Sequence, residues 1–160
     1  MTTDFSSLNL RSELTQALNE LGYSEPTPIQ LGMIPLMLTG VDVIGQAQTG
    51  TGKTAAFALP ILHNFQKQKN PQALVLAPTR ELALQVADSM NEYGKHLHIR
   101  VLAVYGGQPY GPQINNLRRG VDIVVGTPGR LNDLLERGVL ILKDVKTVVL
   151  DEADEMLNMG

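Results

Sequence analysis

Apolar residues recur along most of the chain at spacings typical of either helices or strands. Near the N-terminus, apolar residues at helical spacing are followed by a glycine suited to end a helix: Leu10, Leu14, Ala17, Leu18, Leu21 and Gly22. Pro26 and Pro28 then interrupt the pattern, and a second helix is predicted to start at Thr27.

Beyond this point, short apolar runs alternate with helical patterns. Strands are predicted over residues 42–46, 73–77, 100–104, 122–126 and 145–150, and helices over 53–65, 82–93, 113–119 and 130–137. The last strand is expected to be fully buried, because Val148-Val149-Leu150 lacks apolar and polar alternation. Strands separated by helices predict an α/β fold with a mainly parallel sheet and helices on both faces.

Length and composition suit one soluble domain over residues 1–160: 43% of the residues are apolar and 18% are charged. The absence of cysteine excludes disulfides and cysteine metal sites. No secretory signal is visible in residues 1–12, and the apolar run 55–62 is too short to span a bilayer. We therefore expect a cytoplasmic protein without membrane association. The net charge of −3 means that any nucleic-acid role must depend on a local site.

The segment between the first predicted strand and its helix matches the phosphate-loop pattern G-x-x-x-x-G-K-[ST] except at its first position: Ala47-Gln48-Thr49-Gly50-Thr51-Gly52-Lys53-Thr54. Gly50 and Gly52 allow the tight turn that points backbone N–H groups at phosphate oxygens. Lys53 is placed to reach the β- and γ-phosphates, and Thr54 to hold Mg²⁺. An ordinary glycine turn before a helix is the alternative, but the Gly-Lys-Thr spacing favours nucleotide binding.

Two acidic residues, Asp151 and Glu152, follow the last predicted strand. The carboxyl end of a parallel strand is where ligands bind in α/β folds. Asp151 is placed to hold Mg²⁺, and Glu152 to orient and deprotonate a water that attacks the γ-phosphate. A solvated acidic helix start is the alternative, and the phosphate loop in the same chain favours catalysis.

The phosphate loop and Asp151-Glu152-Ala153-Asp154 together resemble the first RecA-like domain of a DEAD-box RNA helicase. Further matches follow in the family's order: Phe5 upstream of residues 22–30 (the Q motif), residues 78–83 (motif Ia), Gly106-Gly107 (the GG doublet) and Thr127-Pro128-Gly129-Arg130 (motif Ib). The sequences of residues 105–108 and 154–157 are most similar to those of bacterial cold-shock-type members. The resemblance implies a RecA-like P-loop NTPase fold, ATP and Mg²⁺ as cofactors, and ATP hydrolysis coupled to RNA duplex unwinding.

The resemblance also implies that the Gln30 amide pairs with the adenine edge of ATP. Thr27-Pro28-Ile29-Gln30 is at the same time a capping box, in which Gln30 bonds back to the helix start. Phe5 and Tyr23 offer aromatic rings near the base, although both suit the core equally well. Glu25 stands where family members often carry a basic residue, so no adenine contact is expected from it.

RNA contacts are implied at Thr79, Arg80, Gly106, Gly107, Thr127, Pro128, Gly129 and Arg130. Thr79 and Thr127 each follow a predicted strand and suit the N-cap of a helix, whose N-terminus attracts phosphates. Arg80 and Arg130 would add local charge, and the Gly106-Gly107 backbone would approach the ribose-phosphate. The alternative for each site is plain capping and turn chemistry, which contributes about 1 kcal/mol to stability.

The family works with two RecA-like domains, and the second domain, with its arginine fingers, is expected to be absent from this chain. Because an arginine finger contributes on the order of 10³–10⁵ in turnover, we expect weak nucleotide binding and slow hydrolysis by residues 1–160 alone. Two other functions stay open: a P-loop ATPase that acts on DNA or protein, and a module that binds nucleotide or RNA without catalysis. Gln30 and motif Ib argue against the first of these.

Overall fold

The computed structural model describes residues 3–48 and 50–158. The chain forms two compact units. The first comprises Met1–Phe65 and Glu92–His98, and the second comprises Gln66–Asn91 and Ile99–Gly160. None of the helices in the described ranges is both long and apolar enough to cross a bilayer.

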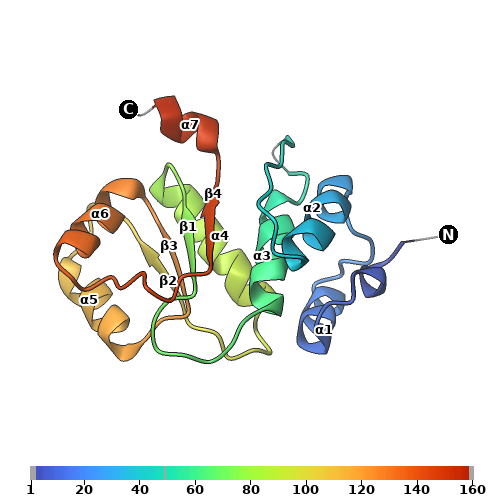
Figure 1. Cartoon of the computed structure of the whole chain (residues 1–160), viewed down its shortest axis with the longest axis horizontal. Coiled ribbons are helices and arrows are strands. Elements are labelled where there is room, and N and C mark those ends of the chain that lie inside the picture. The colour runs from blue at the N-terminus through green and yellow to red at the C-terminus, as the bar shows by residue number, and fades with distance from the viewer. Residues whose placement is uncertain (1–2, 49, 159–160) are drawn as a thin grey trace. The chain divides into compact units, whose positions relative to one another are not determined.

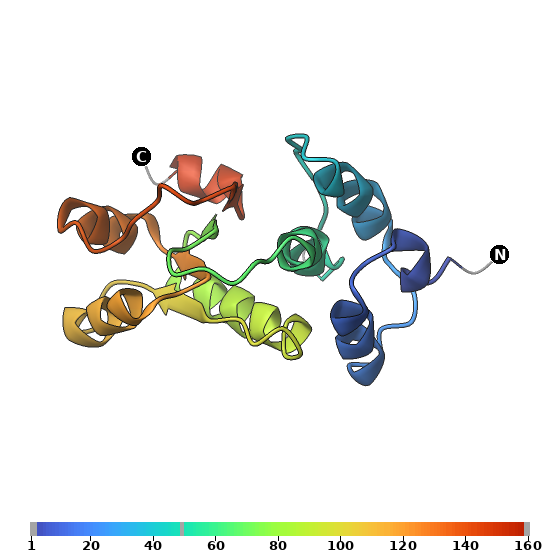
Figure 2. The ribbon, with the colours of Figure 1, turned by 60° about the horizontal axis from the view of Figure 1, so that its bottom comes forward.

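The first unit is helical. It contains the 3₁₀ helix η1 (Phe5–Leu8) and the α-helices α1 (Ser12–Glu20), α2 (Pro28–Leu38) and α3 (Lys53–His63). Helix α3 is the centre of this unit, because every residue from position 55 to 62 is buried, as expected for a helix that is apolar on all sides. Figure 2, which looks along α3, shows α1 and α2 beside it.

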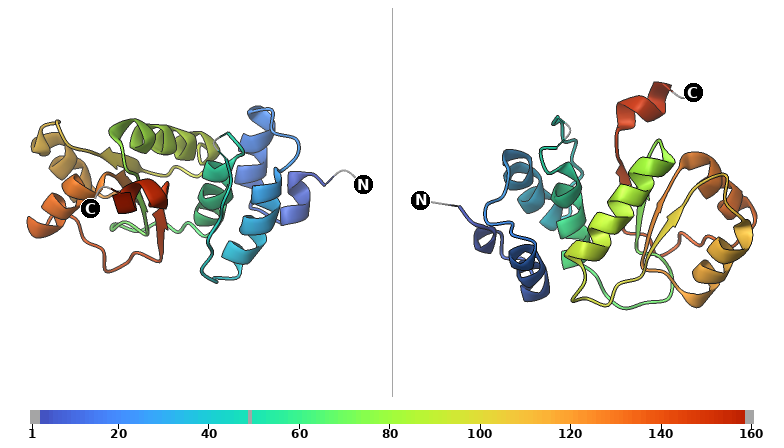
Figure 3. Two further views of the ribbon diagram at one scale, coloured as in Figure 1. Left: turned by 90° about the horizontal axis from the view of Figure 1, so that it is seen from above. Right: turned by 180° about the vertical axis from the view of Figure 1, so that it is seen from behind.

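The second unit is built on a parallel sheet with strand order β2-β3-β1-β4. The strands are β1 (Ala73–Leu76), β2 (Val101–Val104), β3 (Ile123–Gly126) and β4 (Thr147–Leu150). The helices are α4 (Arg80–Tyr93), α5 (Tyr110–Arg119), α6 (Pro128–Glu136) and the short α7 (Ala153–Asn158). Helix α4 lies on one side of the sheet and α5 and α6 on the other (Figures 1 and 3). Right-handed crossovers require this arrangement for the observed strand order. The α/β fold with helices on both faces is therefore confirmed.

The α5 and α6 face of the sheet carries an apolar core. Leu74 and Val124 lie in register on β1 and β3 and are buried beneath these helices. The cluster is completed by Val104, Leu117, Val121, Leu131, Leu134 and Leu140. Gly126 ends β3, where an added Cβ would lie 2.6 Å from Val104 and 2.8 Å from Leu131. The absence of a side chain at this position therefore allows α6 to begin close to the sheet.

An ion pair between Arg100 and Asp122 lies at the end of the sheet where β2 and β3 begin. The Asp122 side chain is 0% exposed and forms two hydrogen bonds with the Arg100 guanidinium, of 2.8 and 3.1 Å. Asp122 also accepts the Arg100 backbone N–H at 2.8 Å, and Arg100 donates to the Gln68 carbonyl. The hydrogen bond with Asp122 raises the pKa of the Arg100 guanidinium, against an opposing contribution from its burial. This network fixes the start of β2 to the start of β3.

Most predicted elements are confirmed within a few residues. Thr27 is the N-cap of α2, and α1 ends before Gly22, whose φ of 81° is the left-handed conformation that suits glycine. Helix α5 begins three residues before its predicted start, since Tyr110 is already helical. The 3₁₀ helix η1 was not predicted, and Asp4 caps it by accepting the Ser6 N–H at 3.0 Å.

Two predictions are wrong. Residues 42–46 do not form a strand, because within the described chain no neighbouring strand offers them a hydrogen-bond ladder, and Ile44 is 96% exposed. The last strand is not fully buried either. Val148 and Leu150 are 58% and 57% exposed, because β4 is the edge strand of the described sheet.

Removal of the buried carboxylate should destabilise the second unit. We expect Asp122→Ala to lower the free energy of unfolding by about 2–3 kcal/mol, because it leaves the half-buried Arg100 and a backbone N–H without their acceptor. Urea unfolding measures the change, and Asp88→Ala on an exposed face of α4 is the control, expected within about 0.5 kcal/mol of wild type. Equal effects of the two substitutions would contradict the role given to Asp122.

Candidate nucleotide and nucleic-acid site

The phosphate loop leads directly into α3. Gly50 and Gly52 have φ values of 82° and 85°, which confirms that glycine is needed for this turn. Gly52 is the N-cap of α3, and the Thr51 hydroxyl donates to the Gln48 carbonyl at 2.5 Å. Thr49, which was predicted to bind nucleotide, lies outside the described residues.

The charge at the start of α3 suits an anion. The first turn contains no acidic residue, so the partial positive charge of the helix N-terminus is not compensated there. Lys53 and Thr54 occupy the first two helical positions and are half-buried, as is Ala47, whereas Gln48 and Gly50 are exposed. Backbone N–H groups, a helix N-terminus and a lysine are the groups that bind phosphates in such loops.

The Gln30 side chain joins the start of α2 to the phosphate loop. Its Oε1 accepts the Thr27 N–H at 3.0 Å, which confirms the predicted capping contact, and its Nε2 donates to the Gly52 carbonyl at 3.1 Å. Gln30 is 6% exposed. The second contact was not predicted, because the sequence does not show that residues 22 positions apart are neighbours.

The aromatic residues near the N-terminus differ in exposure. Phe5 is 5% exposed, so its ring packs in the core of the first unit, as the core alternative predicted. Tyr23 is 48% exposed and contacts Tyr93, with ring centroids 6.3 Å apart. Contact of either ring with adenine stays a prediction.

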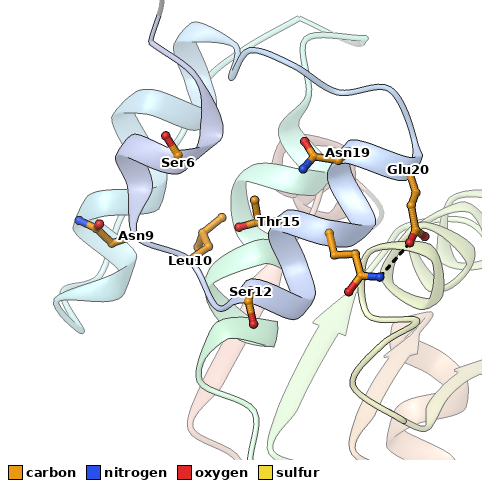
Figure 4. Close-up of a pocket in the computed structure, with 8 residues that line it drawn as sticks. Ser6, Asn9, Leu10, Ser12, Thr15, Asn19 and Glu20 are labelled. Atoms are coloured by element: carbon orange, nitrogen blue, oxygen red, sulfur yellow. Dashed lines mark hydrogen bonds between the residues drawn. The ribbon is translucent and has the colours of Figure 1, made fainter.

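A shallow hollow lies between η1 and α1 in the same unit (Figure 4). Most of the residues that line it have polar side chains, among them Ser6, Asn9, Thr15, Asn19 and Glu20. Gln16 donates to Glu20 at 3.2 Å there, and hydrogen bonds from Lys95 and His96 lower the pKa of Glu20. None of the predicted site residues lines this hollow.

The parallel sheet of the second unit brings its predicted site residues to one edge, which is formed by the carboxyl ends of the strands. Backbone hydrogen bonds continue past the strands at this edge: from Ala77 to Gly126 at 2.9 Å, from Thr127 to Val104 at 3.1 Å, and from Asp151 to Leu76 at 2.9 Å. The segments that begin with Thr79, Gly106, Thr127 and Asp151 therefore leave the sheet from the same edge. Ligands bind at this edge in open α/β sheets.

The acidic pair sits at a change in backbone direction. Asp151 is 8% exposed, and its backbone N–H donates to the carbonyl of Leu76 at the end of β1. The next residue, Glu152, is half-buried and has a φ of 52°. A left-handed conformation costs a non-glycine residue about 1–2 kcal/mol. Such strain is typical of functional positions, and here it separates the strand from α7.

The two predicted N-caps behave differently. The Thr79 hydroxyl accepts the Leu82 N–H at 3.2 Å, which confirms that Thr79 caps α4. Thr127 precedes Pro128 at the start of α6, and its carbonyl accepts the Leu131 N–H, but its hydroxyl makes no capping bond within the described chain. Thr79 and Gly129 are exposed, and Thr127 and Pro128 are half-buried.

The two predicted RNA-binding arginines also differ. Arg80 is exposed, with its guanidinium carbon 5.5 Å from the centre of the Tyr105 ring. Arg130 is 7% exposed and donates to Gln113 and to the Gln108 carbonyl, each at 2.9 Å. Sequence reasoning missed Gln108 and Gln113, because polar residues in a turn and on a helix resemble ordinary surface residues.

The donors predicted to hold Mg²⁺ have suitable chemistry. A hydroxyl at Thr54 and a carboxylate at Asp151 are hard oxygen donors. Within the described residues, no group of three or more histidine, cysteine or acidic side chains is arranged to hold a metal on its own. This fits Mg²⁺, which is usually bound through one or two protein ligands together with the phosphates of the substrate.

A phosphate loop that opens a helix and an acidic pair after a parallel strand define a P-loop nucleotide-binding protein. The family model for DEAD/DEAH box helicases matches residues 27–160. The chain therefore belongs to the DEAD/DEAH box helicase family.

Named relatives agree with this assignment. The chain is 57% identical over 160 residues to the ATP-dependent RNA helicase DeaD of Escherichia coli K12, covering 99% of this chain and 25% of that protein. It is 55% identical to the ATP-dependent RNA helicase CshA of Listeria monocytogenes, covering 99% of this chain and 31% of that protein. The chain therefore spans only about a quarter to a third of the length of these relatives.

Solved structures confirm the RecA-like fold. A DEAD box protein from the hyperthermophile Methanococcus jannaschii matches 98% of this chain and 43% of its own, at 44% identity and a TM-score of 0.93. A hypothetical ATP-dependent RNA helicase from Sulfolobus tokodaii matches 94% of this chain and 44% of its own, at 46% identity and a TM-score of 0.87.

An alanine at position 52 should disturb the phosphate loop. Its Cβ would lie 2.3 Å from Gln30 Nε2, in addition to the cost of the left-handed φ. We expect Gly52→Ala to cost about 2–4 kcal/mol of unfolding free energy and to weaken ATP binding in a calorimetric titration.

Gly40→Ala is the matched control, since Gly40 has a φ of 87° but nothing within 4 Å of an added Cβ. It should cost only about 1–2 kcal/mol. In a Gln30→Ala background the extra cost of Gly52→Ala should shrink. If Gly52→Ala and Gly40→Ala were equally destabilising, the steric role of Gln30 would be wrong.

Proposed function

We propose that residues 1–160 form the N-terminal, ATP-binding RecA-like domain of an ATP-dependent RNA helicase that couples ATP hydrolysis to RNA duplex unwinding. The observation that carries the proposal is the Gln30 side chain, which binds the phosphate loop at Gly52. An ordinary glycine turn does not require such a buried amide. The relatives are named ATP-dependent RNA helicases.

ATP is proposed to bind with its phosphates on residues 47–54. Backbone N–H groups of the loop and the N-terminus of α3 would surround the phosphates, and Lys53 would pair with the β- and γ-phosphates. The adenine is proposed to lie near Gln30 and Phe5. Since both Gln30 amide atoms already bind backbone groups, recognition of adenine by Gln30 would also depend on the position of the phosphate loop.

Hydrolysis is proposed to use the acidic pair after β4. Thr54 and Asp151 would hold Mg²⁺, which supplies charge neutralisation at the β- and γ-phosphates when bound. Glu152, whose φ of 52° marks the break between β4 and α7, would accept a proton from the attacking water. Lys53 would stabilise the negative charge that develops on the transferred phosphate.

RNA is proposed to bind along the edge where the strands end. Thr79, Arg80, Gly106, Gly107 and Gly129 are exposed there, and with Thr127, Pro128 and Arg130 they make up the predicted RNA site. Exposed glycine backbone and helix starts bind sugar and phosphate without reading bases. This explains how a chain with a net charge of −3 would bind RNA.

The working enzyme is proposed to need a second RecA-like domain in the parent protein, with both domains in the cytoplasm. Arginine fingers from that domain would contribute on the order of 10³–10⁵ to turnover. Residues 1–160 alone would then bind nucleotide weakly and hydrolyse it slowly, and would serve mainly as a binding module.

Lys53→Ala should weaken nucleotide binding by this chain. We expect a loss of about 10- to 100-fold in ATP affinity, because a charge-assisted contact to phosphate is removed, and a smaller loss for ADP. Isothermal titration calorimetry measures both, with Lys67→Ala at an exposed position as the control. Unchanged ATP affinity would exclude the phosphate role of Lys53.

Glu152→Gln in the full-length protein should keep ATP binding and lose hydrolysis. We expect RNA-stimulated turnover to fall by about 10²–10⁴, the usual contribution of a general base. Glu155→Gln, exposed on α7, is the control. Comparing RNA with DNA as the stimulating polymer tests the helicase proposal itself: stimulation by DNA alone would favour a DNA-directed ATPase instead.

A further inference from the structure

Three neighbouring groups in the second unit hold Arg130. Its two terminal nitrogens donate to Gln113 Oε1 and to the Gln108 carbonyl, each at 2.9 Å. Its guanidinium carbon also lies 4.0 Å from the centre of the Tyr110 ring. Only 7% of Arg130 is exposed, so its guanidinium interacts with protein groups and not with solvent.

Tyr110 extends these contacts. Its ring lies 3.9 Å from the guanidinium carbon of Arg137 as well, so both arginines interact with the same ring. Its hydroxyl donates to Asp133 at 2.8 Å. The start of α5 is therefore fixed to α6 and to Arg137, which follows it, by cation–π contacts and a hydrogen bond.

These contacts hold both ends of the Gly106-Gly107 doublet. On one side, the Gln108 carbonyl accepts from Arg130 at 2.9 Å. On the other side, the Tyr105 carbonyl accepts from Gln113 at 3.5 Å, and Gln113 is itself bound by Arg130. The two glycines between these points are exposed, and nothing lies within 4 Å of an added Cβ at either one. The residues on either side of the two glycines are therefore held by hydrogen bonds, while the glycines themselves stay exposed.

We infer that Arg130 is a positioning residue, which holds the Gly106-Gly107 backbone in place for RNA through Gln108 and Gln113 and makes no phosphate contact itself. The inference rests on the proposed RNA-binding function. Arg80 is the contrasting residue, because it is exposed and its guanidinium lies over the face of Tyr105. A lysine would keep the charge of Arg130 but would lose its planar pair of donors.

The test compares Arg130→Lys and Gln113→Met with Arg80→Met in the full-length protein. RNA affinity is measured over a range of salt concentrations. For Arg130→Lys and Gln113→Met we expect about 10-fold weaker binding or more, as for lost hydrogen bonds to a charged group, with an unchanged salt slope. For Arg80→Met the slope should fall by about 1, the result of one lost phosphate contact.

Two further readouts separate positioning from general destabilisation. The RNA concentration for half-maximal ATPase activity should rise about 10-fold in Arg130→Lys, whereas maximal activity and ATP affinity should stay at wild-type values. Hydrogen exchange should accelerate at residues 105–108 and not across the sheet.

Near-wild-type RNA affinity in Arg130→Lys, or a reduced salt slope in Gln113→Met, would overturn the inference, as would faster exchange throughout the second unit. Absence of RNA binding by the wild-type protein would instead overturn the proposed function. Hydrogen exchange measured without RNA would then still decide whether Arg130 holds residues 105–108.

Discussion

The parallel hydrogen-bond ladder around β1 is the constraint on which the second unit depends. β1 pairs with β3 on one side and β4 on the other, and the pairing continues to Ala77, Thr127 and Asp151. Because parallel strands end at a common edge, three distant segments of sequence are delivered to one place. Asp122 and Arg100 fix the opposite ends of β3 and β2, so the register cannot shift without breaking the ion pair of the buried Asp122.

Both units hold a glycine-containing loop with a buried glutamine. Gln30 donates to Gly52, and Gln113 donates to the residue before Gly106-Gly107. A glutamine amide carries donors and an acceptor at the end of a flexible stem, so it can bind two backbone groups in different segments. In each case the glycines supply a turn and an open surface, and the buried amide supplies the rigidity that glycines lack.

The sequence predicted the sheet, the helices and the phosphate loop, because hydrophobic spacing and glycine positions are local properties. It failed where the outcome depends on neighbours far along the chain. Residues 42–46 are apolar enough for a strand but have no ladder partner among the described residues. Arg130 looked like a free cation next to a helix start, and only packing shows that Tyr110 and Gln113 bind it. Long-range polar contacts of this kind have no periodic signature.

The exposed face of β4 has a consequence for how the chain behaves in solution. An edge strand presents unpaired N–H and C=O groups to any other extended chain, and Val148 and Leu150 add apolar surface beside them. The strand is short, and the exposed Lys146 lies directly before it, which are features that limit edge-to-edge association. Edge-to-edge association of the isolated chain would therefore depend on the balance between two apolar side chains and one exposed charge.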